Sequence, residues 1–352
     1  MSQRWTRRPD GSNWGEFGPD DQAGRLNLIT ADKVRQGIAE VHEGRTFCLS
    51  LPLDYPGGNV LNPRRHPPVL RPTLRNGRPN MNYRLFQDDE NQTDVISDDL
   101  AILHLQYSTQ WDSLAHVGQL FDANGDGIPE AVYYNGYRAG QDVVGPDAAE
   151  DAGAGAAGTA GALRSTSAAR ALGIENMAQR CVQGRAVMID LHARFGDQRI
   201  AVGFEQLMAV LDADKVVVEP GDMVCLHTGF ADRLLEMRGK PDAARLDKLC
   251  AVLDGRDARL LQWISDSGLA VLAADNYAVE AHPAISHRGC CAALPLHEHC
   301  LFKLGVHLGE IWHLGPLAAW LRAHGRSRFL LTAPPLRLPG AVGSPVTPVG
   351  TV

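Results

Sequence analysis

Apolar and polar side chains alternate between residues 102 and 112, and a period of two predicts a β-strand with one buried and one polar face. The polar face would present side chains that bind metals or move protons, namely His104, Gln106, Ser108, Gln110 and Asp112. His116 follows shortly after this segment. A polar face turned toward water is the ordinary alternative, but functional residues are often found where strands end on a rigid scaffold. The segment therefore predicts half of a metal or acid/base site.

The rest of the chain mixes strand and helix patterns, without the regular alternation of a doubly wound sheet. The patterns predict helices at 31–41, 204–211, 246–265 and 314–324, and strands at 46–53, 98–112, 186–191, 223–226, 269–274 and 329–332. No Gly-x-Gly-x-x-Gly turn follows a strand and no P-loop is present, so a nucleotide cofactor is not expected. One α/β or α+β domain spanning residues 1–352 is the expectation.

Three segments show neither the helical nor the strand pattern of apolar residues. Residues 1–30 form an N-terminal arm rich in Trp, Gly and Asp. Residues 55–82 are dense in Pro, Gly, Arg and Asn, which is the composition of a loop. Residues 145–161 are a Gly/Ala-rich insertion. A loop as long as 55–82 inside a compact domain is usually functional or contacts a partner subunit.

Composition excludes several classes of protein. The chain is 44% hydrophobic and 21% charged, which is enough to bury a large core. A net charge of −7 and the lack of any Lys/Arg run argue against nucleic-acid binding. No stretch has the apolar length of a membrane span, so a cytoplasmic protein is expected. Seven cysteines without a Cys-x-x-Cys pair fit a reducing compartment and disfavour a thiolate metal site; those at 48, 181, 225 and 250 lie in apolar runs and are expected to be buried.

A second cluster of candidate ligands lies between residues 297 and 313. It contains four histidines and two glutamates within 17 residues, among them His297 and Glu310. Each histidine taken singly is more often structural than a ligand, but imidazole together with carboxylate is a ligand set for zinc or manganese. The run Asp122–Gly127 begins like a calcium-binding loop, but Tyr133 stands where such a loop needs Glu, so a turn is the better interpretation.

These residues resemble a known family, the cyclase-like metal-dependent hydrolases that include bacterial kynurenine formamidase and isatin hydrolase. The family signature is His-x-Gly-Thr-His-x-Asp-x-Pro-x-His. Thr109, Asp112 and His116 match it literally, while Gln106 and Gln110 stand at its first two histidines. Further similar stretches occur in order from residue 13 to about residue 345, so the chain resembles a longer branch of the family that carries Thr-Gln-Trp-Asp.

The resemblance implies an architecture and a quaternary structure. The expected fold is a single compact α/β domain with a barrel-like mixed β core and surrounding helices, of the swivelling β/β/α type. The expected assembly is a homodimer or homotetramer in which an N-terminal loop can contribute to the neighbour's site. No nucleic-acid or membrane partner is implied.

The resemblance also implies a site. Asp112, His297 and Glu310 would hold a divalent ion, Zn or Mn, with His116 as a further ligand or as the base beside the metal. Gln106 and Gln110 would offer amide oxygens where imidazole nitrogens are stronger donors. Such a site would bind metal more weakly, lose one of two ions, or shift toward harder ions such as Mn²⁺.

Three functions fit these features. The first is a metal-dependent hydrolase of amides or lactones acting on a small, cyclic or aromatic-derived substrate, with His116 as base to a metal-activated water. The second is a metal-dependent lyase or isomerase, and the third is an inactive, metal-free relative. Trp111, Phe121, Tyr133 and Tyr134 could line a pocket for a flat substrate or pack the core instead. Substrate carboxylates could bind to a group of basic residues in the long loop, namely Arg64, Arg65, His66 and Arg75.

Overall fold

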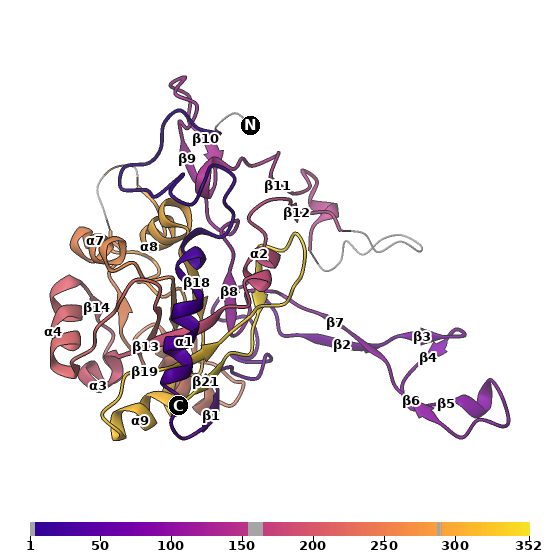
Figure 1. The fold of residues 1–352 in the computed structure, drawn as a ribbon. Helices are drawn as coiled ribbons and strands as arrows, with labels where there is room; N and C mark the ends of the chain where they lie inside the picture. Colours follow the sequence, from indigo (N-terminus) through magenta and orange to yellow (C-terminus); the bar gives the residue numbers. More distant parts are fainter. Residues whose placement is uncertain (1–3, 154–164, 287–288, 290) are drawn as a thin grey trace.

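A curled nine-stranded half-barrel sheet forms the centre of the computed structural model, which describes residues 4–153, 165–286, 289 and 291–352 (Figure 1). In spatial order its strands are β1 (Thr46–Cys48), β21 (Val349–Thr351), β19 (Arg328–Thr332), β13 (Gln183–Asp190), β15 (Met223–His227), β17 (Val271–Ala274), β18 (His307–Glu310), β8 (Gln110–Asp112) and β20 (Gly343–Pro345). Strands β13, β15, β17 and β18 are parallel to one another, whereas β19, β8 and β20 pair antiparallel. The sheet confirms the mixed α/β class expected from the resemblance.

Both faces of this sheet are buried, which explains why its central strands are continuous apolar runs. Along β13, Val187 and Ile189 belong to one core, and Ala186 and Met188 belong to the other. Helices α4 and α7 contribute to the first core, while α2 and α9 contribute to the second. The helices are α1 (Ala31–Ala39), α2 (Ile174–Gln179), α3 (Leu191–Phe195), α4 (Phe204–Asp214), α5 (Phe230–Glu236), α6 (Ala243–Leu246), α7 (Ala258–Ser267), α8 (Pro295–His297) and α9 (Gly315–Ala323).

The predicted strand at 98–112 is two strands joined by a bend. Strand β7 (Asp99–Ile102) ends before a turn in which the Tyr107 amide donates to the His104 carbonyl oxygen at 3.1 Å, and β8 starts only at Gln110. Thr109 fixes the entry to β8, because its Oγ1 donates to the Ile311 carbonyl oxygen and accepts from the Leu51 amide. The prediction of one continuous strand with a single polar face across 102–112 was therefore wrong.

The second half of the predicted loop at 55–82 is part of a β-ribbon that projects from the body of the molecule (Figure 1). We call residues 69–102 the ribbon; it contains β2 (Val69–Pro72) paired with β7, β3 (Leu74–Arg75) with β4 (Arg78–Pro79), and β5 (Tyr83–Arg84) with β6 (Val95–Ile96). Asn76 and Gly77 both have positive φ, at 49° and 74°. An Asn-Gly pair of this kind makes the tight turn of a hairpin, so loop composition here marks a turn between strands.

The predicted helix at 246–265 and the predicted burial of four cysteines are each only partly confirmed. The helix predicted at 246–265 begins only at Ala258, because Val252–Leu253 forms strand β16 and Asp257 caps the helix through the Arg259 and Leu260 amides. Cys225 and Cys250 are buried, but Cys48 and Cys181 are exposed. The remaining short strands are β9 (Gln119–Phe121), β10 (Glu130–Val132), β11 (Val143–Val144), β12 (Ala168–Ala169) and β14 (Ala201–Val202).

The structure also describes most of the N-terminal arm and part of the Gly/Ala-rich insertion. The described part of the N-terminal arm packs against its own chain, where the Trp14 indole donates to the Phe302 carbonyl oxygen at 2.7 Å. Of the insertion at 145–161, residues 154–161 lie outside the described residues. Within the described ranges, no helix has the length and apolarity to cross a membrane.

Candidate metal centre

Asp112, His297 and Glu310 meet in the buried centre of the molecule. One ligand atom from each lies within 4.8 Å of the others, and each residue is at most 3% exposed. The sheet brings two of them together, because β8 and β18 are antiparallel neighbours in which Gln110 pairs with Glu310 and Asp112 with Leu308. His297 comes from α8, at the start of the histidine-rich segment. The described residues contain no other group of this kind.

Glu280 holds the His297 ring in place. It accepts hydrogen bonds from the Leu296 and His297 amides and from His297 Nδ1, the last at 2.8 Å. The other ring nitrogen, Nε2, lies 3.2 Å from Glu310 Oε1 and so points into the cluster. A carboxylate on one imidazole nitrogen fixes the tautomer and presents the other nitrogen as a ligand, which is a usual arrangement in metal sites.

Burial dominates the electrostatics of the Asp112 carboxyl. It raises the pKa of this group, as does the neighbouring Glu310, although His116, His297 and Arg65 act to lower it. For Glu310 burial acts in the same direction, but the hydrogen bond from His297 outweighs it and lowers the pKa. Burial would lower the pKa of His297, but its bonds to Glu280 and Glu310 outweigh burial and raise that pKa to about 10. The balance of buried charge thus favours a cation near Asp112.

Gln110 completes the arrangement through the orientation of its amide. In one orientation Nε2 donates weakly to Asp112 Oδ1 at 3.3 Å and to Glu310 Oε2 at 3.4 Å. In the reversed orientation Nε2 donates to the carbonyl oxygens of Gln106 at 2.7 Å and Ser108 at 3.2 Å. The reversed bonds are shorter, and they turn the amide oxygen toward the two carboxylates. Three oxygen atoms facing one another are favourable only around a cation.

The residues present therefore fit a divalent metal. Asp112 is fully buried and its Oδ2 has no hydrogen-bond partner, and a buried charged oxygen without a partner is costly unless it binds an ion. Two carboxylates, one oriented imidazole and one amide oxygen make four donors of the type that hard and borderline divalent ions take.

His116 and Gln106, which were expected as a ligand or base and as a ligand, stand apart from the three clustered side chains. His116 Nε2 is 3.9 Å from Asp112 Oδ1, with 21% of the side chain exposed, so it stands at the solvent-facing edge of the cluster. Gln106 contributes its backbone carbonyl to this region, while its side chain lies against Gly343, where an added Cβ would be 2.4 Å from Nε2.

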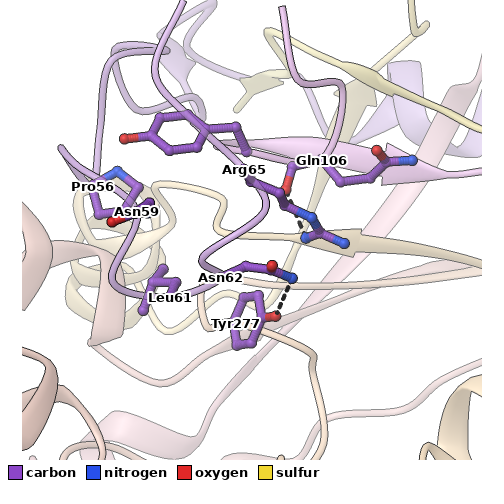
Figure 2. A pocket seen from close by; sticks show the side chains of 8 residues that line it. Pro56, Asn59, Leu61, Asn62, Arg65, Gln106 and Tyr277 are labelled. Atoms are coloured by element: carbon purple, nitrogen blue, oxygen red, sulfur yellow. Dashed lines mark hydrogen bonds between the residues drawn. The ribbon is translucent and has the colours of Figure 1, made fainter. Parts of the chain in front are cut away.

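A small, partly enclosed cavity lies beside the centre (Figure 2). Its lining comes from the segment before the ribbon, from Gln106 and Tyr107, and from Tyr277; the first group is Pro56, Asn59, Leu61, Asn62 and Arg65. Figure 2 shows Asn62 bonded to the Tyr277 hydroxyl and Arg65 turned toward Gln106, whose carbonyl oxygen it reaches at 2.7 Å. Arg65 also acts electrostatically on Asp112 and Glu310, so the cavity and the metal centre are adjacent.

The four aromatic residues considered for a substrate pocket lie elsewhere. Trp111 is fully buried and packs edge-on against Trp312 at 4.8 Å between ring centroids. Tyr134 is also fully buried, and Phe121 and Tyr133 pack against the core that contains Trp14 and Phe302. None of the four lines the cavity of Figure 2. Their core interpretation therefore fits the structure better than the pocket one.

Sequence patterns did not predict the role of Glu280. It lies 17 residues before His297 in a segment without periodic structure, and only the fold brings its carboxylate to the ring. Arg65 was one of four basic residues that the sequence offered for substrate binding, and the structure separates it from Arg75, which bonds to Asp88 within the ribbon.

A half-barrel sheet with a buried cluster of carboxylates and imidazole defines the class of α/β fold to which the chain belongs. Residues 49–281 match the family described as "Putative cyclase", and the chain belongs to that family. Among curated proteins none matches the chain. A crystal structure titled as a novel cyclase is 30% identical, with 97% of each chain covered and a TM-score of 0.68.

More distant structures share the fold alone. An isatin hydrolase bound to the product analogue thioisatinate is 12% identical, covering 92% of this chain and 99% of its own, with a TM-score of 0.54. Isatin hydrolase A from Labrenzia aggregata, bound to benzyl benzoate, is 12% identical, covering 87% of this chain and 93% of its own, with a TM-score of 0.51.

Proposed function

We propose that this protein is a metal-dependent hydrolase that opens an amide or lactone bond in a small substrate. The observation that carries the proposal is the buried cluster of Asp112, His297 and Glu310, with an unpartnered carboxylate oxygen and an adjacent cavity. The isatin hydrolases supply support at the level of fold, since they act on a cyclic amide by name.

The donors define what the centre would hold. Asp112, His297, Glu310 and the Gln110 oxygen would bind one divalent ion, which supplies Lewis acidity for a carbonyl oxygen and makes a water molecule more acidic. Three of these four donors are oxygens, so we propose a preference for Mn²⁺ that is stronger than in a histidine-rich site. Glu280 would hold His297 in its liganding orientation through the Nδ1 bond.

His116 is the proposed general base. It stands next to Asp112 at the exposed edge of the cluster, where a water molecule and a substrate carbonyl can both approach. The water oxygen bonds to the carbonyl carbon, His116 takes one water proton, and it returns that proton to the leaving nitrogen or oxygen as the C–N or C–O bond breaks. A cyclic substrate would give one product with a new carboxylate.

Arg65 is proposed to bind the substrate. Among the described residues, the partner of its guanidinium is the Gln106 carbonyl oxygen, and the side chain lines the cavity. A guanidinium in this position can bind a carboxylate or a polarised carbonyl oxygen of the substrate. The Arg65 guanidinium would therefore favour substrates that carry a carboxylate, or that form one on hydrolysis, over purely apolar substrates.

The test is turnover of a panel of small formamides, cyclic imides and lactones with Zn²⁺ and Mn²⁺. We expect His116→Ala to lose about 10²- to 10⁴-fold in kcat with the metal content unchanged, and His42→Ala, which changes an exposed histidine after α1, to keep full activity. Full activity of a metal-free preparation would contradict the proposal. Solvent ¹⁸O must appear in the product; turnover without it would favour the lyase or isomerase alternative, and a protein that neither binds metal nor turns over any substrate would favour the inactive one.

A further inference from the structure

One short turn ties the cavity to the metal centre. It follows β17 directly and ends at Glu280, which holds the His297 ring through Nδ1 at 2.8 Å. Near the start of the turn, the Asn276 carbonyl oxygen accepts from the Ile311 amide at 3.0 Å, and Ile311 directly follows the metal-binding glutamate. Tyr277 lies between these two bonds and lines the cavity. The backbone that orients the metal ligands therefore also sets the position of Tyr277.

The backbone of this turn is strained directly after Tyr277. Ala278 and Val279 have φ values of 71° and 59°, which lie in the left-handed region, and for a β-branched residue such a value is a genuine outlier. Val279 is fully buried, so packing holds it in this conformation. Strain of this kind persists where the surrounding structure enforces it, and it is concentrated at binding and catalytic sites. The turn thus points to a function for the side chain of Tyr277.

The lining of the cavity is basic and contains no acidic residue. Of its eight residues only Arg65 carries a charge. One guanidinium nitrogen, Nη1, donates to the Gln106 carbonyl oxygen at 2.7 Å, and the planar group has further N–H donors to offer. A guanidinium binds a carboxylate through two parallel hydrogen bonds, which are stronger than its bonds to neutral acceptors. The cavity therefore favours an anionic group over a cationic or uncharged one.

Asn62 prepares a second donor in the cavity. Asn62 is buried, and its Oδ1 accepts from the Arg64 amide at 3.1 Å. That bond assigns the orientation of the side-chain amide, so Nδ2 donates to the Tyr277 hydroxyl oxygen at 3.4 Å (Figure 2). A hydroxyl whose oxygen accepts a hydrogen bond still has its own proton to donate. No hydrogen bond among the described residues uses that proton, so a ligand in the cavity can accept it.

The cavity has room for a small group only. It contains about 200 Å³ of empty space, its open mouth included, whereas most ligand sites contain roughly 300–1,000 Å³. A carboxylate with the carbon atoms next to it fits this space. The bond to be hydrolysed must reach the adjacent metal centre, so one substrate molecule would span both places.

We infer that this cavity binds a carboxylate of the substrate through the Arg65 guanidinium and the Tyr277 hydroxyl, and that this carboxylate is separate from the bond that is hydrolysed. Asn62 is a positioning residue, because its bond directs the Tyr277 proton into the cavity. The substrates are therefore small carboxylic acids that also carry an amide or a lactone. Only this last step rests on the proposed function; binding of the carboxylate does not.

The test is calorimetric titration of the full-length protein, as purified and again after treatment with a chelator. The probes are benzoate and nitrobenzene, which have the same shape, differ in charge and contain no bond that a hydrolase can open. We expect benzoate to bind at least about tenfold more tightly than nitrobenzene, because only benzoate forms charge-assisted hydrogen bonds. Chelation should leave this ratio unchanged, since the cavity and not the metal ion holds the carboxylate.

Three variants locate the bound carboxylate. Arg65→Gln should weaken benzoate binding about 10- to 100-fold, and Tyr277→Phe about tenfold, because each removes a charge-assisted hydrogen bond. Asn62→Asp keeps the shape of the side chain but places an anion where it accepts the Tyr277 proton. It should weaken benzoate binding at least about tenfold without weakening Mn²⁺ or nitrobenzene binding, which a merely structural role of Asn62 would not do. The matched control is Arg64→Gln, because Arg64 is an exposed neighbour that does not line the cavity; it should bind benzoate as the wild type does.

Equal affinity for the two probes, or no binding of benzoate to the wild type at millimolar concentration, would overturn the inference. Loss of benzoate binding on chelation would assign the carboxylate to the metal ion, and unchanged affinity in Arg65→Gln and Tyr277→Phe would assign it to another site; both contradict the inference. If Asn62→Asp lacks the circular dichroism of the wild type, Tyr277→Phe, which removes a single oxygen atom, decides. Benzoate binding in the cavity without turnover of any amide or lactone would support this inference and contradict the proposed function instead.

Discussion

Two clusters of histidine and carboxylate follow the strands of the same sheet, and they differ in how their charges are balanced. The first is the metal centre of Asp112, His297, Glu310 and Gln110. The second, which we call the His227 cluster, consists of Asp190 at the end of β13, His227 at the end of β15, and three residues beyond the sheet, namely Asp232, His313 and Arg322.

In the His227 cluster each carboxylate has cationic or donor partners within the chain. Asp190 accepts from His227 Nδ1 at 2.8 Å, from Arg322 Nε at 2.8 Å and from the Ala193 amide at 3.0 Å. Asp232 lies 3.1 Å from His313 Nε2 and 3.7 Å from His227 Nε2. The metal centre instead leaves Asp112 Oδ2 without a partner. Residue types alone would rank the two clusters equally, and only the balance of charge separates a structural network from a site that needs an ion.

The largest expected effect is that of removing the Asp112 carboxylate, which should reduce activity strongly and change stability little. Asp112→Asn should lower kcat/KM by about a thousandfold or more, because the ion is lost, yet change the free energy of unfolding of the metal-free protein by less than about 1 kcal/mol. Urea unfolding in the presence of a chelator and turnover with added Mn²⁺ measure the two quantities. A strongly destabilised Asp112→Asn would mean that Asp112 is structural.

His227→Gln should show the opposite pattern, with a loss of stability of about 3 kcal/mol near pH 6 and little effect on metal content. Burial would lower the pKa of His227, but the hydrogen bond to Asp190 and the nearby Asp232 carboxylate outweigh burial and raise that pKa to about 10. A raised histidine pKa stabilises the folded state fully below about pH 6.5, and this contribution is lost as the pH rises through about 10. The variant should therefore differ from the wild type less at pH 10.5 than at pH 6.

The pH dependence has a lower limit set by Asp190. Burial would raise its pKa, but the hydrogen bond from His227 outweighs burial and lowers that pKa to about 2. Its contribution is present above about pH 4 and is lost as the pH falls through about 2. Urea midpoints between about pH 1.5 and pH 10.5 measure both limits, with His42→Gln as the control that should follow the wild type. A difference between variant and wild type that does not change with pH would show that folding does not shift the pKa of His227.

Glu280→Gln should weaken metal binding by about 10- to 100-fold, because a neutral amide holds the His297 ring less firmly and makes its nitrogen a weaker donor. Competition with a chromogenic chelator gives the dissociation constant. The effect must be smaller than that of Asp112→Asn; equal effects would indicate that Glu280 itself binds the ion.

Gln110→His should have the smallest effect, a shift of roughly tenfold in the ratio of Zn²⁺ to Mn²⁺ affinity in favour of Zn²⁺, because imidazole replaces an amide oxygen. Metal analysis after dialysis against equal concentrations of both ions measures the ratio. An unchanged ratio would place the Gln110 oxygen outside the ligand set.

Much of the site was predictable from residue types and from the resemblance to a family. Asp112 lies nearly two hundred residues before His297 and Glu310 in sequence, and only the adjacency of β8 and β18 with α8 brings them together. Tertiary contacts of this kind leave no local pattern, which is why the role of Glu280 was not predicted and why Arg65 could not be told from the other basic residues of its loop. The fold class and most central strands were predicted because buried parallel strands are continuous apolar runs.

The failures have physical causes of the same kind. Alternation at 102–112 arose in a segment held by tertiary hydrogen bonds from Thr109 and Tyr107, not by a continuous ladder. The loop composition of 55–82 concealed a ribbon, although Asn76-Gly77 carried a hairpin signal that short-range analysis could have used. In both places the residues that form turns and tertiary hydrogen bonds determined the structure more than the pattern of apolar and polar side chains did.

The central claim is that the charge of the buried Asp112, His297 and Glu310 cluster is balanced by a divalent ion. Calorimetric titration of Mn²⁺ into the chelator-treated, full-length protein tests it most directly, with Asp112→Asn titrated alongside. We predict one ion bound per wild-type chain and no measurable binding to the variant. No binding to the wild-type protein, or equal binding to both, would contradict the account.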